Sequence, residues 1–201
     1  FRDVTFVFHC AGLISFKPND FDKLIEVNVQ GTANIVNLCI DFGVKKLCYV
    51  SSVATLSATP NKLITEESDW NLYSNAIEEN NTDYAISKHG GEMEVWRGSQ
   101  EGLKVVVVNP SVVLGSGFYD SGSGLLFKKI AEGLSYYPSG GTGFVAVTDV
   151  VRAMILLQFS EIENRRFILN TANLSYHSLF EKIAQAMGVK APTKLVSHKK
   201  L

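Results

Sequence analysis

The chain has 201 residues, of which 46% are hydrophobic, and its 19 basic and 20 acidic side chains leave a formal charge of −1. This length and composition predict one globular domain or a little more, with one sizeable core. The balanced charge, without a basic stripe, argues against a nucleic-acid surface, and the longest apolar runs, at residues 4–10 and 103–108, are too short to span a bilayer.

No signal-peptide pattern opens the sequence, and three cysteines, Cys10, Cys39 and Cys48, lie singly in apolar segments. Their odd number and wide spacing fit buried, reduced thiols better than disulfides or metal ligands. We therefore expect a cytoplasmic protein with neither a metal site nor a membrane partner.

Three apolar segments, residues 4–10, 46–51 and 104–109, are predicted as buried strands. A long helical stretch over residues 18–42 separates the first two strands, and a helix over residues 84–100, with capping residues before it, precedes the third. The segment from residue 53 to residue 80 is predicted as a long loop. This alternation of strands and helices predicts an α/β fold with a doubly wound parallel sheet.

Beyond Pro110 the sequence becomes richer in glycine and serine. We predict loops at residues 115–124 and 136–143, and little pattern in the tail over residues 190–201. The remaining elements are predicted as helices or short strands: helices at 125–133, 149–159 and 175–187, and strands at 144–147 and 167–170.

Tyr84 and Lys88 lie one turn apart on the same face of a predicted helix. An ammonium beside a phenol favours the phenolate, by about 4 kcal/mol at ~4 Å and an effective dielectric of ~20. Such an attraction would bring the pKa of a tyrosine toward the range of a general acid or base. An exposed helix turn without function explains the same spacing, so this pair by itself leaves both interpretations open.

Each of the three predicted strands ends in small or polar residues. In an open parallel sheet, ligands bind in the crevice beyond the carboxyl ends of the strands. Taken singly, Gly12 is explained as a turn and Ser52 as a cap. Together with the helix that carries Tyr84 and Lys88, the strand ends predict a convergent polar site, to which three segments contribute: Cys10-Ala11-Gly12, Ser51-Ser52 and Asn109-Pro110-Ser111.

The ordered motifs resemble the extended branch of the short-chain dehydrogenase/reductase superfamily, the NAD-dependent epimerase/dehydratase type. The resemblance covers residues 4–188 and is closest to dihydroflavonol reductase-like and 3β-hydroxysteroid dehydrogenase-like members. It is carried by HCAG at 9–12, NVQGT at 28–32, YVSS at 49–52, YAISK at 84–88, PSVVLG at 110–115 and FVAVTD at 144–149.

This resemblance implies a Rossmann-like fold with NAD or NADP as cofactor. It implies a Rossmann-like NAD(P)-binding domain over residues 1–114 and 144–170, and a small substrate-binding portion over residues 115–143 and 171–201. It also implies that Tyr84 is the general acid or base at the substrate oxygen, that Ser52 donates to the same oxygen, and that Lys88 lowers the pKa of Tyr84 and binds the nicotinamide ribose.

Two implied roles keep an alternative. Ser52 is preferred to Ser51 because the hydroxyl residue of the family usually falls second in the pair, but Ser51 stays open. Asn28 would position a proton-relay water through its backbone, or would mark only an irregularity in the helix. The expected cofactor-binding residues are Cys10, Ala11, Gly12, Val50, Ser51, Tyr84, Lys88, Pro110, Ser111, Val112 and Val113.

The sequence departs from the family pattern at two points. The glycine-rich pyrophosphate turn and the residue that would choose between NAD and NADP do not occur, so we expect a chain without the first βαβ unit and part of the C-terminus. Asn109 stands where many nucleotide-sugar enzymes have an arginine before the proline, which disfavours a nucleotide-sugar substrate.

The sequence therefore predicts an NAD(P)-dependent oxidoreductase that interconverts a secondary alcohol and a ketone on a small organic substrate. Loops at residues 116–124 and 136–143 would line the substrate pocket. The alternatives are a nucleotide-sugar epimerase or dehydratase, and a non-catalytic dinucleotide-binding protein. The resemblance also raises a homodimer formed through the two long helices; Val95 and Trp96 would then form that face, although we favour their packing on the sheet.

Overall fold

The computed structural model describes residues 1–56, 63–68, 70 and 82–196. The chain folds as two compact units. The first comprises Phe1–Pro110 and Arg152–Leu169, and the second comprises Ser111–Val151 and Asn170–Leu201.

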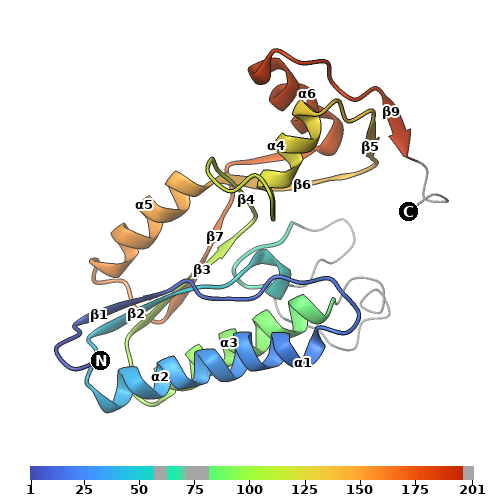
Figure 1. Cartoon of the computed structure of the whole chain (residues 1–201). Coiled ribbons are helices and arrows are strands. Elements are labelled where there is room, and N and C mark those ends of the chain that lie inside the picture. The colour runs from blue at the N-terminus through green and yellow to red at the C-terminus, as the bar shows by residue number, and fades with distance from the viewer. Residues whose placement is uncertain (57–62, 69, 71–81, 197–201) are drawn as a thin grey trace. The chain divides into compact units, whose positions relative to one another are not determined.

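The first unit contains a four-stranded, fully parallel sheet in the order β1-β2-β3-β7 (Figure 1). Because all four strands run in the same direction, their carboxyl ends lie at one edge of the sheet. Strand β3 is buried along its whole length, as its uninterrupted apolar run predicts. The predicted α/β fold is confirmed, with strands β1 (Phe6–His9), β2 (Lys46–Val50), β3 (Val105–Pro110) and β7 (Arg165–Leu169).

One continuous helical stretch follows β1, as predicted, but a π-helical turn interrupts it. It consists of α1 (Phe21–Leu24), the π-helix η1 (Ile25–Gln30) and α2 (Gly31–Asp41). Gly43 follows the end of α2 at φ 64°, a left-handed conformation that glycine adopts without strain. Helix α3 (Asp83–Gln100) begins at Thr82, whose hydroxyl accepts from the amide of Ala85.

Helices cover both faces of this sheet (Figure 1). Helices α2 and α3 contact each other and lie on one face, and the end of α5 (Val147–Gln158) lies on the other. Three hydrogen bonds connect the end of α5 and the residues after it to β2. Gln158 donates to the carbonyl of Lys46 at 2.9 Å, and the buried Lys46 ammonium donates to the carbonyls of Leu157 and Ser160 at 2.6 and 2.9 Å.

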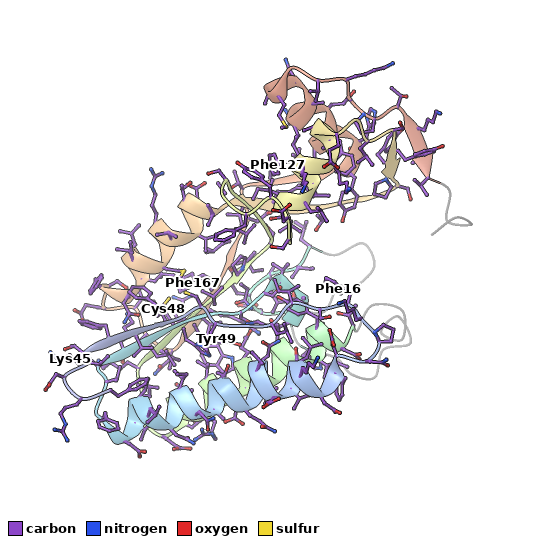
Figure 2. The ribbon with its side chains drawn as sticks, viewed as in Figure 1. Phe16, Lys45, Cys48, Tyr49, Phe127 and Phe167 are labelled. Atoms are coloured by element: carbon purple, nitrogen blue, oxygen red, sulfur yellow. The ribbon has the colours of Figure 1, made fainter. Side chains whose placement is uncertain are left out.

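The main core of the first unit lies between the sheet and the helices α2 and α3. Successive residues of β2 point to opposite faces, and Figure 2 shows Tyr49 on the side of these helices and Cys48 on the other side. Val95 is fully buried in this core and Trp96 packs against it, which agrees with packing on the sheet. The buried residues are Val36, Cys39, Val44, Leu47, Tyr49, Val95, Leu103, Val105 and Val107.

The second unit is built on two small sheets and two helices. In the three-stranded sheet, β6 pairs parallel with β4 and antiparallel with β8, and in the other sheet β5 pairs with β9. Helix α6 begins at Ser175, whose hydroxyl accepts from Ser178, and ends at Gly188 with φ 66°, as predicted. The elements are β4 (Val112–Leu114), α4 (Gly124–Ala131), β5 (Tyr136–Pro138), β6 (Gly141–Ala146), β8 (Ala172–Ser175), α6 (Tyr176–Met187) and β9 (Lys194–Val196).

Some sequence-based expectations are wrong. The segment 136–143, predicted as a loop, contains β5 and the start of β6, and β4, β8 and β9 were not predicted. Each of the missed strands has only three or four residues, too few for a period-2 pattern, and forms through its pairing partner. Cys10 is exposed rather than buried, because it follows the last residue of β1 at the edge of the sheet.

The predicted long loop before α3 can be compared with the structure only in part. Of the long loop predicted before α3, most lies outside the described residues, and its described beginning forms a short 3₁₀ turn, η2 (Val53–Thr55). Among the described residues, every helix is too short or too polar to cross a bilayer. The role of the second unit in substrate binding stays a prediction.

Candidate active site

The side chains of Ser52 and Tyr84 lie close enough to interact, since the Ser52 hydroxyl acts to lower the pKa of the Tyr84 phenol. Ser52 directly follows β2 and caps η2, where its Oγ also accepts from the amide of Ala54 at 3.1 Å. Tyr84 lies in the first turn of α3, and both side chains are half-buried. The first unit therefore brings together the two hydroxyl groups that the sequence predicts to meet at one substrate oxygen.

The backbone of Ser52 is held by three donors. Its carbonyl accepts from the Thr55 hydroxyl at 2.8 Å, from the Thr55 amide at 3.1 Å and from Nδ2 of Asn109 at 3.1 Å. Asn109 comes from β3, so two strand ends fix the position of this serine. The neighbouring Ser51 points elsewhere, since its hydroxyl donates to the carboxylate of Glu92 at 2.5 Å.

Lys88 lies one turn after Tyr84 and is buried, with only 5% of its surface exposed. Its Nζ donates to Tyr49 Oη at 3.1 Å and to the Val50 carbonyl at 2.9 Å. An ammonium has three donors, and its hydrogen bonds with the described residues use two, so among these residues one donor is left for a ligand hydroxyl. Burial lowers the pKa of Lys88 to about 8, against the opposing influence of Glu92 and Cys10.

The pKa of Tyr84 is raised above its ordinary value because the phenol is buried, and the Ser52 hydroxyl acts in the opposite direction. Lys88 is not among the causes of this shift, since its ammonium is directed toward Tyr49 and Val50. In this structure Tyr84 is thus a proton donor at neutral pH. Its activation by Lys88 stays a prediction.

Asn28 is 1% exposed and lies within the π-helix η1, so the predicted helix irregularity is present. Its side chain binds the backbone of Leu13 in both directions, at 2.7 and 2.9 Å, and donates to Ser87 Oγ at 2.9 Å. Its carbonyl accepts from the Thr32 hydroxyl at 2.7 Å. Asn28 therefore fixes the segment after β1 against two helices, a role that the sequence does not indicate; the proton-relay role stays a prediction.

The segment Cys10-Ala11-Gly12 offers exposed backbone beside Lys88. A Cβ atom at Gly12 would lie 3.3 Å from Asn28 Oδ1 and 3.7 Å from Lys88 Nζ, so only a residue without a side chain leaves this space open. Open backbone and an available Lys88 donor fit the ribose and nicotinamide end of a dinucleotide.

The other expected cofactor residues are divided between the units. Val50 takes part through its carbonyl, and Pro110 ends β3 beside Asn109 in the first unit. The remaining three belong to the second unit and stay predictions: Ser111, Val112 and Val113.

Glu92 is a site residue that sequence reasoning missed. Its carboxylate is 1% exposed and accepts hydrogen bonds from side chains of several elements. A spacing of four residues after Lys88 and eight after Tyr84 places it on the same face of α3, and this spacing could have indicated it. Its donors are Ser51, Thr55 and Asn109 on Oε2, and Trp96 and Arg166 on Oε1.

An exposed aromatic ring lies beside Tyr84, and a cavity lies apart from the predicted site residues. Phe16 lies in the loop between β1 and α1 (Figure 2) and is 71% exposed. Its ring centroid lies 5.7 Å from that of Tyr84. A separate cavity of about 680 Å³ contains none of the predicted site residues, and is lined by Trp70, His89, Met93, Trp96, Asn164, Arg165 and Arg166. The described residues include no cluster of three or more metal-ligating side chains.

A parallel sheet with helices on both faces, and with Ser52, Tyr84 and Lys88 at its carboxyl edge, defines a Rossmann-type domain of the extended short-chain dehydrogenase/reductase superfamily. Residues 1–138 match an NAD-binding family described as "Male sterility protein", and the chain belongs to this family. The resemblance to the superfamily and the nicotinamide cofactor predicted from sequence are therefore confirmed.

Curated relatives carry the names of reductases. A Synechocystis protein named for dihydroflavonol 4-reductase is 26% identical over 196 residues, which cover 94% of this chain and 56% of the relative. Tetraketide alpha-pyrone reductase 2 of Arabidopsis thaliana is 31% identical over 189 residues, or 87% of this chain and 58% of the relative. The chain thus spans somewhat more than half the length of these relatives.

Solved structures share the fold. The crystal structure of gox2253 has a TM-score of 0.83 at 25% identity and is matched over 97% of this chain and 59% of its own. The UDP-glucose 4-epimerase of Thermus thermophilus, solved as a complex with NAD, has a TM-score of 0.79 at 24% identity, over 96% of this chain and 64% of its own. The epimerase likeness is evidence for the fold alone.

Proposed function

We propose that the protein is an NAD(P)-dependent oxidoreductase that interconverts a secondary alcohol and a ketone on a small organic substrate. The observation that carries the proposal is the placement of the Ser52 hydroxyl, after β2, close enough to the Tyr84 phenol to act on its pKa, with Lys88 one turn further along the same helix. Two hydroxyl groups that lie this close can both bind a third oxygen placed between them.

In the direction of reduction, a bound nicotinamide would supply the hydride. Tyr84 Oη would deliver the proton to the substrate oxygen, and Ser52 Oγ would donate a second hydrogen bond to that oxygen. The raised pKa of Tyr84 suits this role, because the phenol keeps its proton until the substrate needs it. Lys88 would use its remaining donor on a ribose hydroxyl and so orient the ring.

Two observations support a ketone reductase over a nucleotide-sugar epimerase or dehydratase. The named curated relatives are reductases. In addition, Nδ2 of Asn109 is buried and contacts Ser52, Thr55 and Glu92, so this side chain is not placed to bind an external phosphate. The second unit would supply most of the pocket for the small-molecule substrate.

The test is turnover of the full-length protein with NADH and NADPH against a panel of ketones and a panel of nucleotide sugars. Tyr84→Phe should lower turnover by about 10²–10⁴-fold and leave cofactor affinity nearly intact, because only the proton donor is removed. Tyr176→Phe is the matched control, since that ring packs with Phe144 and Phe180 in the second unit. Unchanged turnover in Tyr84→Phe would refute the proposed role of the phenol.

The same assay addresses the two alternatives. Net NAD(P)H consumption with a ketone supports the reductase, whereas conversion of a nucleotide sugar without net consumption supports an epimerase. Cofactor binding with no turnover on either panel supports a non-catalytic dinucleotide-binding protein. The ratio of activities with NADH and NADPH gives the cofactor preference.

A further inference from the structure

The carboxylate of Glu92 joins most of the elements that build the site. Oε2 accepts from Ser51 at 2.5 Å and from Asn109 at 3.0 Å, and it lies 3.0 Å from the Thr55 hydroxyl, whose one proton is shared between Oε2 and the Ser52 carbonyl. Oε1 accepts from Trp96 at 3.2 Å and from Arg166 at 3.4 Å. The donors come from the ends of β2 and β3, from η2, from α3 itself and from β7. A buried carboxylate is costly unless its oxygens are paired, and here both are.

Two of these contacts connect Glu92 to the backbone carbonyl of Ser52. Thr55 and Asn109, which contact Glu92 Oε2, also contact the Ser52 carbonyl, at 2.8 and 3.1 Å. The Ser52 hydroxyl in turn acts on the pKa of Tyr84. Glu92 is therefore connected to the backbone of Ser52 through two intermediate side chains.

The charge of Glu92 also acts on the Lys88 ammonium. The groups around the Lys88 ammonium are Tyr49 on β2, His9 and Cys10 at the end of β1, and Glu92 on its own helix. The imidazole of His9 is neutral near pH 7, since burial lowers its pKa to about 4. The thiol of Cys10 is also neutral there, because partial desolvation of the sulfur raises its pKa, although the residue as a whole is exposed. Glu92 is the carboxylate in this set, and its charge favours the ammonium form of Lys88.

We propose that Glu92 is a positioning residue of this site: its carboxylate holds Ser52 against Tyr84 and provides the negative charge that faces Lys88. The catalytic part of this inference rests on the proposed oxidoreductase function, whereas the contacts and the charge do not. A purely structural role would require only that Glu92 keep the unit folded.

The test is Glu92→Gln in the full-length protein, compared with Glu94→Gln. Glutamine keeps the volume, and the hydroxyls of Ser51 and Thr55 can accept from its amide, but the charge is lost. We expect kcat to fall about 10- to 100-fold, because a small displacement of a catalytic group has such an effect. Glu94 is the matched control, since it forms a partly exposed ion pair with Arg97 on the same helix, and its variant should keep full activity.

A second readout separates this inference from the proposed function. The pKa of the Lys88 side chain, followed by NMR in protein with labelled lysine, should be lower in Glu92→Gln than in the unsubstituted protein, and the alkaline fall of kcat/KM should move to lower pH in parallel. If the unsubstituted protein reduces no ketone, the proposed function fails, and this titration still tests the role of Glu92. An unchanged Lys88 pKa together with unchanged kcat would overturn the inference.

Thr55→Val covers the case in which Glu92→Gln does not fold. This variant removes one link between Glu92 and Ser52 and leaves the charge in place. It should lower kcat about tenfold or more without moving the pKa of Lys88. Full activity in Thr55→Val would contradict positioning of Ser52 through this path.

Discussion

Gly91 is the position at which a single methyl group should disturb the site most. It lies on α3 between Lys88 and Glu92 and packs against η1. A Cβ atom there would lie 2.4 Å from the carbonyl oxygen of Asn28 and 2.6 Å from Tyr49 Oη. Ordinary van der Waals contact begins at 3.4 Å. In Gly91→Ala, α3 therefore has to move about 1 Å away from η1 to bring the 2.4 Å contact with the Asn28 carbonyl up to this distance.

Two opposing effects set the magnitude for stability. Overpacking of a close contact costs about 1–3 kcal/mol, and replacing glycine by alanine within a helix returns up to about 1 kcal/mol. We therefore expect Gly91→Ala to lower the free energy of unfolding by roughly 1–2 kcal/mol. A 1 Å retreat also lengthens the bond between Lys88 and Tyr49, now 3.1 Å, beyond hydrogen-bond range. Turnover should consequently fall by about 10²-fold.

Gly31→Ala is the matched control. Gly31 lies in the same helical layer at φ −58° and ψ −43°, and the nearest atom to its added Cβ would be the Glu26 carbonyl at 3.7 Å. Alanine fits there and should stabilise the fold by about 0.4–1 kcal/mol. Urea unfolding and steady-state turnover of both variants make the comparison. Gly91→Ala with the stability and activity of the unsubstituted protein would refute the close packing of α3 on η1.

Three further predictions concern stability measured by urea unfolding. The pKa of His9 falls from 6.5 to about 4 on folding, because the imidazole is buried near Lys88, so the unfolded chain binds a proton at a higher pH than the folded protein does. The contribution of neutral His9 to the free energy of unfolding is therefore complete above pH 6.5, and about 2 kcal/mol of it is lost by about pH 5. His9→Gln should abolish this pH-dependent loss. Asn28→Ala removes one buried and two partly buried hydrogen bonds and should cost about 2–4 kcal/mol, and a cost below that of the exposed control Asn37→Ala would contradict it. Lys46→Met leaves two carbonyls at the end of α5 without their donor and should cost about 1–3 kcal/mol, whereas the exposed neighbour Lys45→Met should cost almost nothing; equal effects would argue against the Lys46 contacts.

The elements that the sequence predicts are those with long, regular patterns. The apolar run of β3 and the capped helix α3 contain enough residues for period and caps to agree. The strands β5, β8 and β9 do not, because each becomes a strand only when a distant partner supplies its hydrogen bonds. The composition of the π-helix is that of an ordinary helix, so only the family resemblance at Asn28 indicates an irregularity there, and not its type or extent.

The sequence predicts the features of the candidate site that depend on the spacing of residues along the chain. It does not predict those that depend on the direction in which a side chain points. The spacing of Tyr84 and Lys88 and the polar strand ends indicate which residues gather. The sequence cannot show that Ser51 turns to Glu92 and Ser52 to Tyr84, because adjacent residues differ only in the face to which they point. Nor does a glutamate on a helix indicate burial, since its ion-pair partner Arg166 comes from β7, far along the chain.

The π-helical turn η1 limits which substitutions and deletions this helical segment tolerates. The residues that face inward recur every four positions, which on a regular α-helix would rotate by about 40° at each step and leave the sheet. The wider π-helical turn compensates for this rotation, so α1, η1 and α2 bury residues on the same face of the helical stretch. These residues are Leu24, Asn28, Thr32 and Val36. Substitutions within residues 25–30 preserve this phase, but deleting one residue would turn everything after it by about 100°. Homologous sequences aligned over this segment should therefore vary in composition and not in length.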